Sequence, residues 1–169
     1  MTIKTLKLAV LTAALVMAAC AKKPPATLPQ APGTGATSEA TGPQQGAVRP
    51  GSREDFLGSV PSDRIFFDTD LYNIDDQDRA ILDAQSAWLQ KYANVRVTIE
   101  GHCDERGTRE YNLALGDRRA NAAKNYLQSR GIDPGRMTVI SWGKEKPEAT
   151  GSDEESWAKN RRAVTVVPE

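Results

Sequence analysis

The segment from Glu100 to Ala120 carries most of the residues that could do chemistry. It is denser in charge and hydrogen-bonding groups than its neighbours. Asp104 and Glu105 fall in a polar loop, and Arg118 and Arg119 follow on a predicted helix. We therefore expect the carboxylates and guanidinium groups to surround the opening of one pocket. Binding groups commonly sit on loops held by rigid elements. A charged loop is also often a plain solvated surface, and the residue types alone leave both interpretations open.

Catalytic interpretations of this segment are weak. His102 is the only histidine in the chain, and it adjoins Cys103 and Asp104, so the three side chains cannot easily converge on one tetrahedral ion. Adjacent Asp104 and Glu105 cannot readily flank a sugar bond on opposite faces. The sequence has no nucleophile elbow, P-loop or dinucleotide fingerprint. We predict a protein that is not an enzyme and has no metal or cofactor, with His102 a hydrogen-bonded structural residue and Cys103 a small buried one.

The spacing of apolar residues on either side of this segment alternates between the periods typical of helices and of strands, and so predicts the elements that position it. The order of these strands and helices, βαβαβ(α)β, favours an α+β or α/β two-layer sandwich. Gly101 and Gly107 should supply backbone conformations that other residues avoid. The predicted elements are strand Arg64–Phe67, helix Asp75–Tyr92, strand Val95–Ile99, loop Gly101–Thr108, helix Arg109–Ser129, strand Met137–Trp142, turn Gly143–Gly151, helix Asp153–Lys159 and strand Arg162–Val167.

The N-terminus predicts export. A short basic start precedes an apolar run from Leu8 to Met17, and two alanines precede Cys20. This pattern predicts a signal peptide over residues 1–19, too short to remain as a spanning helix. It is similar to the lipobox of bacterial lipoproteins, which implies an acylated Cys20 and, because Ala21 follows instead of Asp, an outer-membrane location. The alternative is an ordinary signal that leaves Cys20 unmodified.

Amino-acid composition divides residues 20–169 into a linker and a domain. Residues 20–60 are rich in Pro, Ala, Gly, Thr, Ser and Gln, with few large apolar side chains, which predicts a disordered linker. Residues 61–169 then form one domain. Lys+Arg and Asp+Glu both number 22, for a formal net charge of zero, so no overall field draws the chain to nucleic acid.

Several motifs in order resemble the OmpA-like domain family, in particular its peptidoglycan-associated lipoproteins (Pal). The resemblance extends from about Ser59 to the C-terminus and implies one mixed four-stranded sheet with helices packed on it. The chain departs from the family at Cys103, a position often Ala or Thr, and at Trp142, often Tyr. The motifs are Gly101–Thr108, Tyr111–Leu113, Arg118–Ala120, Trp142–Pro147 and Lys159–Val164.

The resemblance implies a ligand, the diaminopimelate side chain of the peptidoglycan stem peptide. By motif position, Asp104 meets the ligand ammonium and Arg119 its carboxylate, while Phe67 and Asp68 line the pocket. A fixed anion and a fixed cation suit a zwitterion, and the planar fork of Arg can bind both carboxylate oxygens. Phe67 could cover the aliphatic part.

Other charged residues have two interpretations each. Glu105 and Arg106 either pair with each other or shape the loop, and Arg118 is expected to be exposed. Arg161 and Arg162 are either scaffold or secondary ligand contacts, with scaffold the preferred interpretation.

The resemblance also implies a role and partners. The domain would tether the outer membrane to peptidoglycan and dock to TolB and other proteins of the Tol–Pal system, which supports envelope integrity and cell division. Two alternatives stay open: a wall-modifying hydrolase or amidase using the same cleft, and a scaffolding lipoprotein that binds proteins first.

Overall fold

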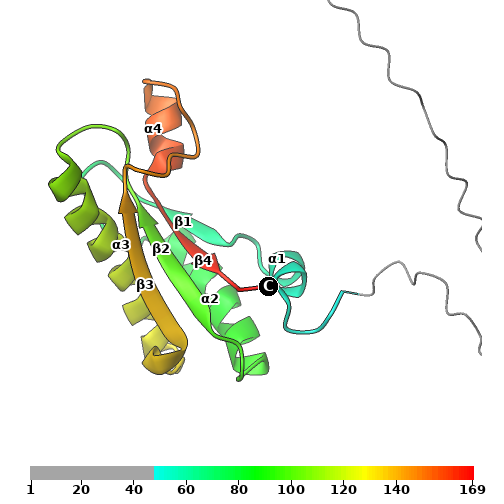
Figure 1. Cartoon of the computed structure of the whole chain (residues 1–169). Coiled ribbons are helices and arrows are strands. Elements are labelled where there is room, and N and C mark those ends of the chain that lie inside the picture. Colours follow the sequence, from blue (N-terminus) through cyan, green and yellow to red (C-terminus); the bar gives the residue numbers. More distant parts are fainter. Residues whose placement is uncertain (1–47) are drawn as a thin grey trace, which may run out of the picture. The chain divides into compact units, whose positions relative to one another are not determined.

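The computed structural model describes residues 48–169 (Figure 1). The predicted signal peptide, Cys20 and most of the predicted linker lie outside this range. Within it, no helix is both long and apolar enough to cross a bilayer. The elements are α1 (Arg53–Ser59), β1 (Arg64–Phe66), α2 (Asp76–Lys91), β2 (Val97–His102), α3 (Arg109–Ser129), η1 (Pro134–Arg136), β3 (Met137–Gly143), α4 (Glu154–Asn160) and β4 (Arg162–Val166).

The four strands form one mixed sheet in the order β1-β4-β2-β3. Strands β2 and β3 are parallel, and β4 is antiparallel to both β1 and β2. Helix α3 is the crossover that a parallel pair requires. Figure 1 shows α2 and α3 on the same face of the sheet. The predicted α+β two-layer sandwich with a mixed four-stranded sheet is therefore confirmed.

The start of helix α2 is fixed by hydrogen bonds between neighbouring residues. The side chain of Asp75 accepts a hydrogen bond from the Asp78 backbone N–H, and the Asp78 side chain accepts one from Asp75, which makes a capping box. Two N–H groups at the helix start are thereby satisfied. The helix ends with Tyr92 as its C-cap, so its observed bounds fall within one residue of the prediction at each end.

Helix α3 crosses strand β2 at unusually close range. A Cβ added to Gly101 would lie 1.8 Å from the carbonyl oxygen of Gly116. Gly101 is therefore required for this close approach, and the expectation that it supplies a special backbone conformation is wrong. Gly107, with φ of 85°, does adopt the left-handed conformation that was expected.

Helix α1 corrects the predicted linker, whose last residues are folded. Ser52 caps the helix, and Phe56 is fully buried with its ring 4.9 Å from that of Trp88. The indole N–H of Trp88 donates to Asp55 over 3.0 Å. The burial of Phe56 against α2 offsets the conformational entropy that is lost when α1 forms, although the surrounding sequence has few other large apolar side chains. The domain thus begins before residue 61.

Strand β2 also extends further than predicted. It continues through Gly101 and His102 because β3 pairs with it in parallel as far as His102 opposite Gly143, with a register shift at that point. The prediction ended this strand at Ile99, where the alternation of apolar and polar residues ends, and placed Gly101 and His102 in the loop. The loop that carries the charged cluster therefore starts at Cys103.

Candidate functional site

A cavity of about 270 Å³ lies at the C-terminal end of β2. Its walls come from the β1–α2 loop, the β2–α3 loop and the first turns of α3, and both Asp104 and Arg119 line it. The structure thus brings the two predicted ligand-binding residues to one hollow. The lining residues are Thr69, Asp70, Cys103, Asp104, Arg106, Gly107, Tyr111, Asn112, Leu115 and Arg119.

Asp104 is a buried carboxylate surrounded by donors. Its Oδ1 accepts from the backbone N–H and the Nε of Arg106, both at 3.1 Å. Its Oδ2 accepts from Nη2 of Arg106 at 2.7 Å and lies 3.5 Å from Nη1 of Arg161. Burial alone would raise the pKa of Asp104, but hydrogen bonds from Arg106 and Arg161 outweigh burial and hold the pKa below its usual value. Asp104 is therefore an anion fixed in the wall of the cavity.

Arg119 is the matching cation, with no exposed surface. Its guanidinium donates to the carbonyl oxygens of Leu71, His102 and Asp68 at 2.9, 2.9 and 3.0 Å. Burial lowers the pKa of Arg119, yet an arginine keeps its proton in proteins. Within residues 48–169 it forms no salt bridge with a carboxylate. A buried positive charge with spare donor capacity therefore faces this cavity.

Phe67 and Asp68 are placed differently from the prediction. Both line a separate cavity of about 410 Å³, together with residues of α2 and α4. The ring of Phe67 lies 5.2 Å from the guanidinium carbon of Arg119, and Asp68 contributes its carbonyl. These two residues hold Arg119 in place, whereas the cavity beside Asp104 is lined by neither.

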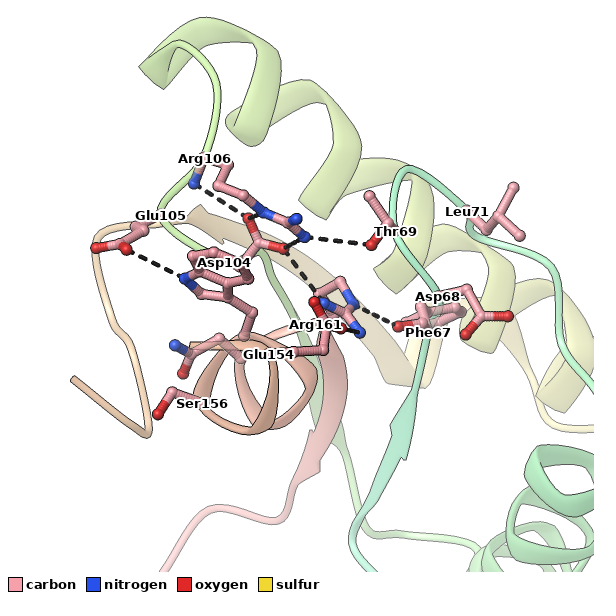
Figure 2. Close-up of polar contacts among 12 residues, drawn as sticks. Phe67, Asp68, Thr69, Leu71, Asp104, Glu105, Arg106, Glu154, Ser156 and Arg161 are labelled. Carbon is pink, nitrogen blue, oxygen red and sulfur yellow. Dashed lines mark hydrogen bonds and ion pairs between the residues drawn. The ribbon is translucent and has the colours of Figure 1, made fainter. Parts of the chain in front are cut away.

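Arg106 pairs with Asp104 and not with Glu105. Its guanidinium lies 4.3 Å from the ring centre of Trp157 and donates to the hydroxyl of Thr69 over 3.2 Å. Glu105 instead accepts from the Trp157 indole N–H at 3.1 Å (Figure 2). Of the two interpretations of this pair, loop shaping is the one that the contacts support.

Arg161 connects three segments that are distant in the chain. It donates to the carbonyl of Phe67 at 2.9 Å and to the carboxylate of Glu154 at 2.8 Å, and it faces Asp104 (Figure 2). Only 6% of the residue is exposed. Arg162 pairs with Glu148 at 3.0 Å, away from the cavity. These contacts support the scaffold interpretation of both arginines.

Cys103 and His102 are each 2% exposed. Burial raises the pKa of the Cys103 thiol to about 11, and the thiol donates to the carbonyl of Asn112 over 3.3 Å. Burial, followed by the charge of Arg162, lowers the pKa of His102 to about 4. Neither ring nitrogen of His102 has a hydrogen-bond partner in the described part of the chain, so the expected hydrogen bonding is not seen, although the residue is buried.

The sequence argument missed several residues of the site. Asn112 donates to the carbonyls of Arg106 and Thr108 at 2.6 and 3.2 Å and so ties the loop to α3. Asn112, Leu115 and Arg119 lie at helical spacing on one face, and that spacing was a usable signal. No group of three or more His, Cys, Asp or Glu side chains that could hold a metal ion occurs in residues 48–169.

The mixed sheet with helices α2 and α3 on one face, and the oppositely charged Asp104 and Arg119 in the lining of one cavity, define the class: a small α+β domain with a cavity of mixed charge. A family model described as the OmpA family matches residues 66–161, more than half of the chain. The chain belongs to the OmpA family.

Named relatives agree with this assignment. A protein of Rhizobium meliloti (strain 1021) named peptidoglycan-associated lipoprotein is 59% identical over 122 residues, which cover 72% of this chain and 69% of that protein. A protein of the same name from Agrobacterium fabrum (strain C58 / ATCC 33970) is 48% identical over 157 residues, covering 93% and 84%. The crystal structure of the peptidoglycan-associated lipoprotein from Burkholderia pseudomallei is similar with a TM-score of 0.62, at 42% identity, covering 67% of this chain and 93% of that one.

Proposed function

We propose that this protein is a non-catalytic lipoprotein of the outer membrane whose domain binds the diaminopimelate side chain of the peptidoglycan stem peptide. The names of its relatives support association with peptidoglycan. The observation that carries the proposal is the cavity of about 270 Å³ lined by both Asp104 and Arg119. The free end of diaminopimelate bears one ammonium and one carboxylate, and the two side chains match them.

Charge pairing gives each residue a role. Asp104 receives the ammonium, and Arg119, a buried cation without a carboxylate partner in residues 48–169, receives the ligand carboxylate. A stem peptide with lysine in place of diaminopimelate lacks that carboxylate. Binding it would desolvate Arg119 without supplying an anion, which is costly. The site therefore prefers diaminopimelate-type peptidoglycan.

Phe67 and Asp68 keep a part in this proposal as positioning residues. The Phe67 ring supports the guanidinium of Arg119, and the Asp68 carbonyl accepts from it. Their contribution is to orient Arg119 toward the ligand carboxylate.

Anchoring supplies the biological role. An acyl chain on Cys20 holds the protein in the outer membrane, while the domain holds the wall, so many copies tether the two layers collectively. As a member of the Tol–Pal system, the protein docks to TolB and other Tol proteins and supports envelope integrity and cell division.

Pull-down on purified sacculi tests the binding role. The wild-type protein should sediment with diaminopimelate-type sacculi and far less with lysine-type sacculi. Asp104→Asn and Arg119→Lys should each lose about tenfold or more in binding, since each alters one charged contact. Arg109→Gln is the matched control because Arg109 is an exposed arginine that pairs with Glu145.

Two results would contradict the proposal. Equal sedimentation of wild type, Asp104→Asn and Arg119→Lys would remove the assignment of the site. Release of soluble muropeptides from the sacculi would show that the protein is a hydrolase.

A further inference from the structure

Both carboxylate oxygens of Asp104 already accept hydrogen bonds from Arg106 before any ligand arrives. Each oxygen has two donors near it: three of the four are atoms of Arg106, and the fourth is Nη1 of Arg161. An ionised carboxylate offers about four acceptor positions. Arg106 fills three of them, so an ammonium that is to contact both oxygens of Asp104 must replace a donor of Arg106.

The contacts identify which donor can leave. Arg161 is almost fully buried and is held by Phe67 and Glu154. The backbone N–H of Arg106 belongs to the loop itself. The Arg106 side chain, in contrast, is 39% exposed, and besides Asp104 its polar and cation–π partners among residues 48–169 are the Thr69 hydroxyl and the Trp157 ring.

Trp157 gives the released guanidinium a place to remain. Its ring already lies 4.3 Å from the guanidinium carbon of Arg106, and its indole N–H is fixed by Glu105. A guanidinium over an indole face is stabilised without any anion. Figure 2 shows Arg106 between Asp104 and Thr69, at the junction of the two loops that form the cavity.

We propose that the Arg106 side chain is an internal competitor that occupies the ammonium position on Asp104 and is displaced by the ligand. This inference rests on the proposed function. The affinity of the site then reflects the difference between two cations at one carboxylate. A ligand that lacks the ammonium leaves Arg106 in place, so Arg106 also determines specificity. Displacement breaks the contact between Arg106 and Thr69 and thereby uncouples the β1–α2 loop from the β2–α3 loop.

Calorimetry on the full-length mature protein tests this exchange. One probe is a soluble stem tripeptide ending in meso-diaminopimelate, and the other has 2-aminopimelate in that place, which keeps the terminal carboxylate but lacks the ammonium. Arg106→Met keeps an unbranched side chain beside Trp157 and removes the competing cation. Arg109→Met removes an equal charge from the same end of the domain without touching Asp104.

The expected pattern is selective. Arg106→Met should bind the diaminopimelate peptide about tenfold more tightly, because one charge-assisted pair no longer has to be broken. Its affinity for the amine-free peptide should equal that of wild type, and Arg109→Met should match wild type with both. Arg106→Lys, which keeps the charge but not the fork, should show a smaller gain with the diaminopimelate peptide.

Other outcomes overturn the exchange. Unchanged or weaker binding of the diaminopimelate peptide by Arg106→Met, in protein whose thermal melting is like that of wild type, would make Arg106 a contact and not a competitor. If Arg106→Met melts early, the absence of a gain in Arg106→Lys decides against the exchange in the same way. A gain that also appears with the amine-free peptide would indicate a general charge effect and would equally count against it. Failure of the wild type itself to bind the diaminopimelate peptide would instead defeat the proposed function.

Discussion

Nη1 of Arg161 lies 3.5 Å from Oδ2 of Asp104, which joins the start of the last strand to the loop after β2. The same guanidinium holds the carbonyl of Phe67 at the end of β1. Because Phe67 in turn lies against Arg119, one buried arginine connects both charged residues of the cavity. The site therefore depends on a residue at its back as well as on the residues that face the ligand.

Arg161→Met should destabilise the domain. The substitution leaves the Phe67 carbonyl without its side-chain donor and takes a cation from the buried Asp104, which together cost about 2–4 kcal/mol. Urea unfolding of the two proteins measures the difference. Arg79→Met is the control, since Arg79 pairs with Asp76 on the surface and should change stability by less than ~0.5 kcal/mol. Equal stability of wild type and Arg161→Met would contradict the role given to Arg161.

Gly101→Ala should be strongly destabilising. The added methyl would lie 1.8 Å from the carbonyl oxygen of Gly116, so α3 would have to move away from β2. Overpacking of this kind costs roughly 3 kcal/mol or more. Gly58→Ala is the matched change, because nothing lies within 4 Å of its new Cβ and a helical Gly→Ala substitution stabilises by about 0.5–1 kcal/mol. Thermal melting of both variants checks the contrast.

His102 should make the domain less stable in mild acid. Its pKa in the folded protein is lowered to about 4, from 6.5 ordinarily, mainly by burial. The unfolded chain therefore binds the proton more readily, so the contribution of His102 is complete above pH ~6.5 and is lost as pH falls toward ~4. We expect a loss of about 2 kcal/mol between pH 7.5 and 5. His102→Gln should lack this part of the pH dependence in urea unfolding, and an identical profile would exclude the assignment.

Cys103 should resist thiol reagents in the folded protein. Burial raises its pKa to about 11, so the thiolate that reacts with iodoacetamide is scarce at pH 8, and the sulfur is also shielded. Modification should become rapid only in denaturant, as followed by mass spectrometry. Fast labelling of the native protein would show that the cavity wall opens at Cys103.

Local features of this fold were encoded in neighbouring residues. The Asp75–Asp78 capping box determines where α2 begins, and Thr108 caps α3 by accepting from the backbone N–H of Tyr111. Helical and strand periods marked the four strands and the helices α2, α3 and α4 to within a few residues, but not α1 or η1. Resemblance to known motifs added the assignment of Asp104 and Arg119 to one ligand site, which residue types alone had left open.

Tertiary structure decided the remaining features. Phe56 makes α1 part of the domain because its ring packs against that of Trp88. A helix of seven residues is too short for its apolar periodicity to predict that contact. Asp104 receives Arg161 in addition to Arg106 of its own loop, and Glu105 receives the Trp157 indole, because the fold brings α4 against the β2–α3 loop. Capping and periodicity depend on residues a few positions apart, whereas the partners of a buried charge depend on distances between segments far apart in the chain. For that reason the sequence by itself determined most of the elements and the key residue types, and only the packed structure determined that α1 belongs to the domain and which charges are already paired.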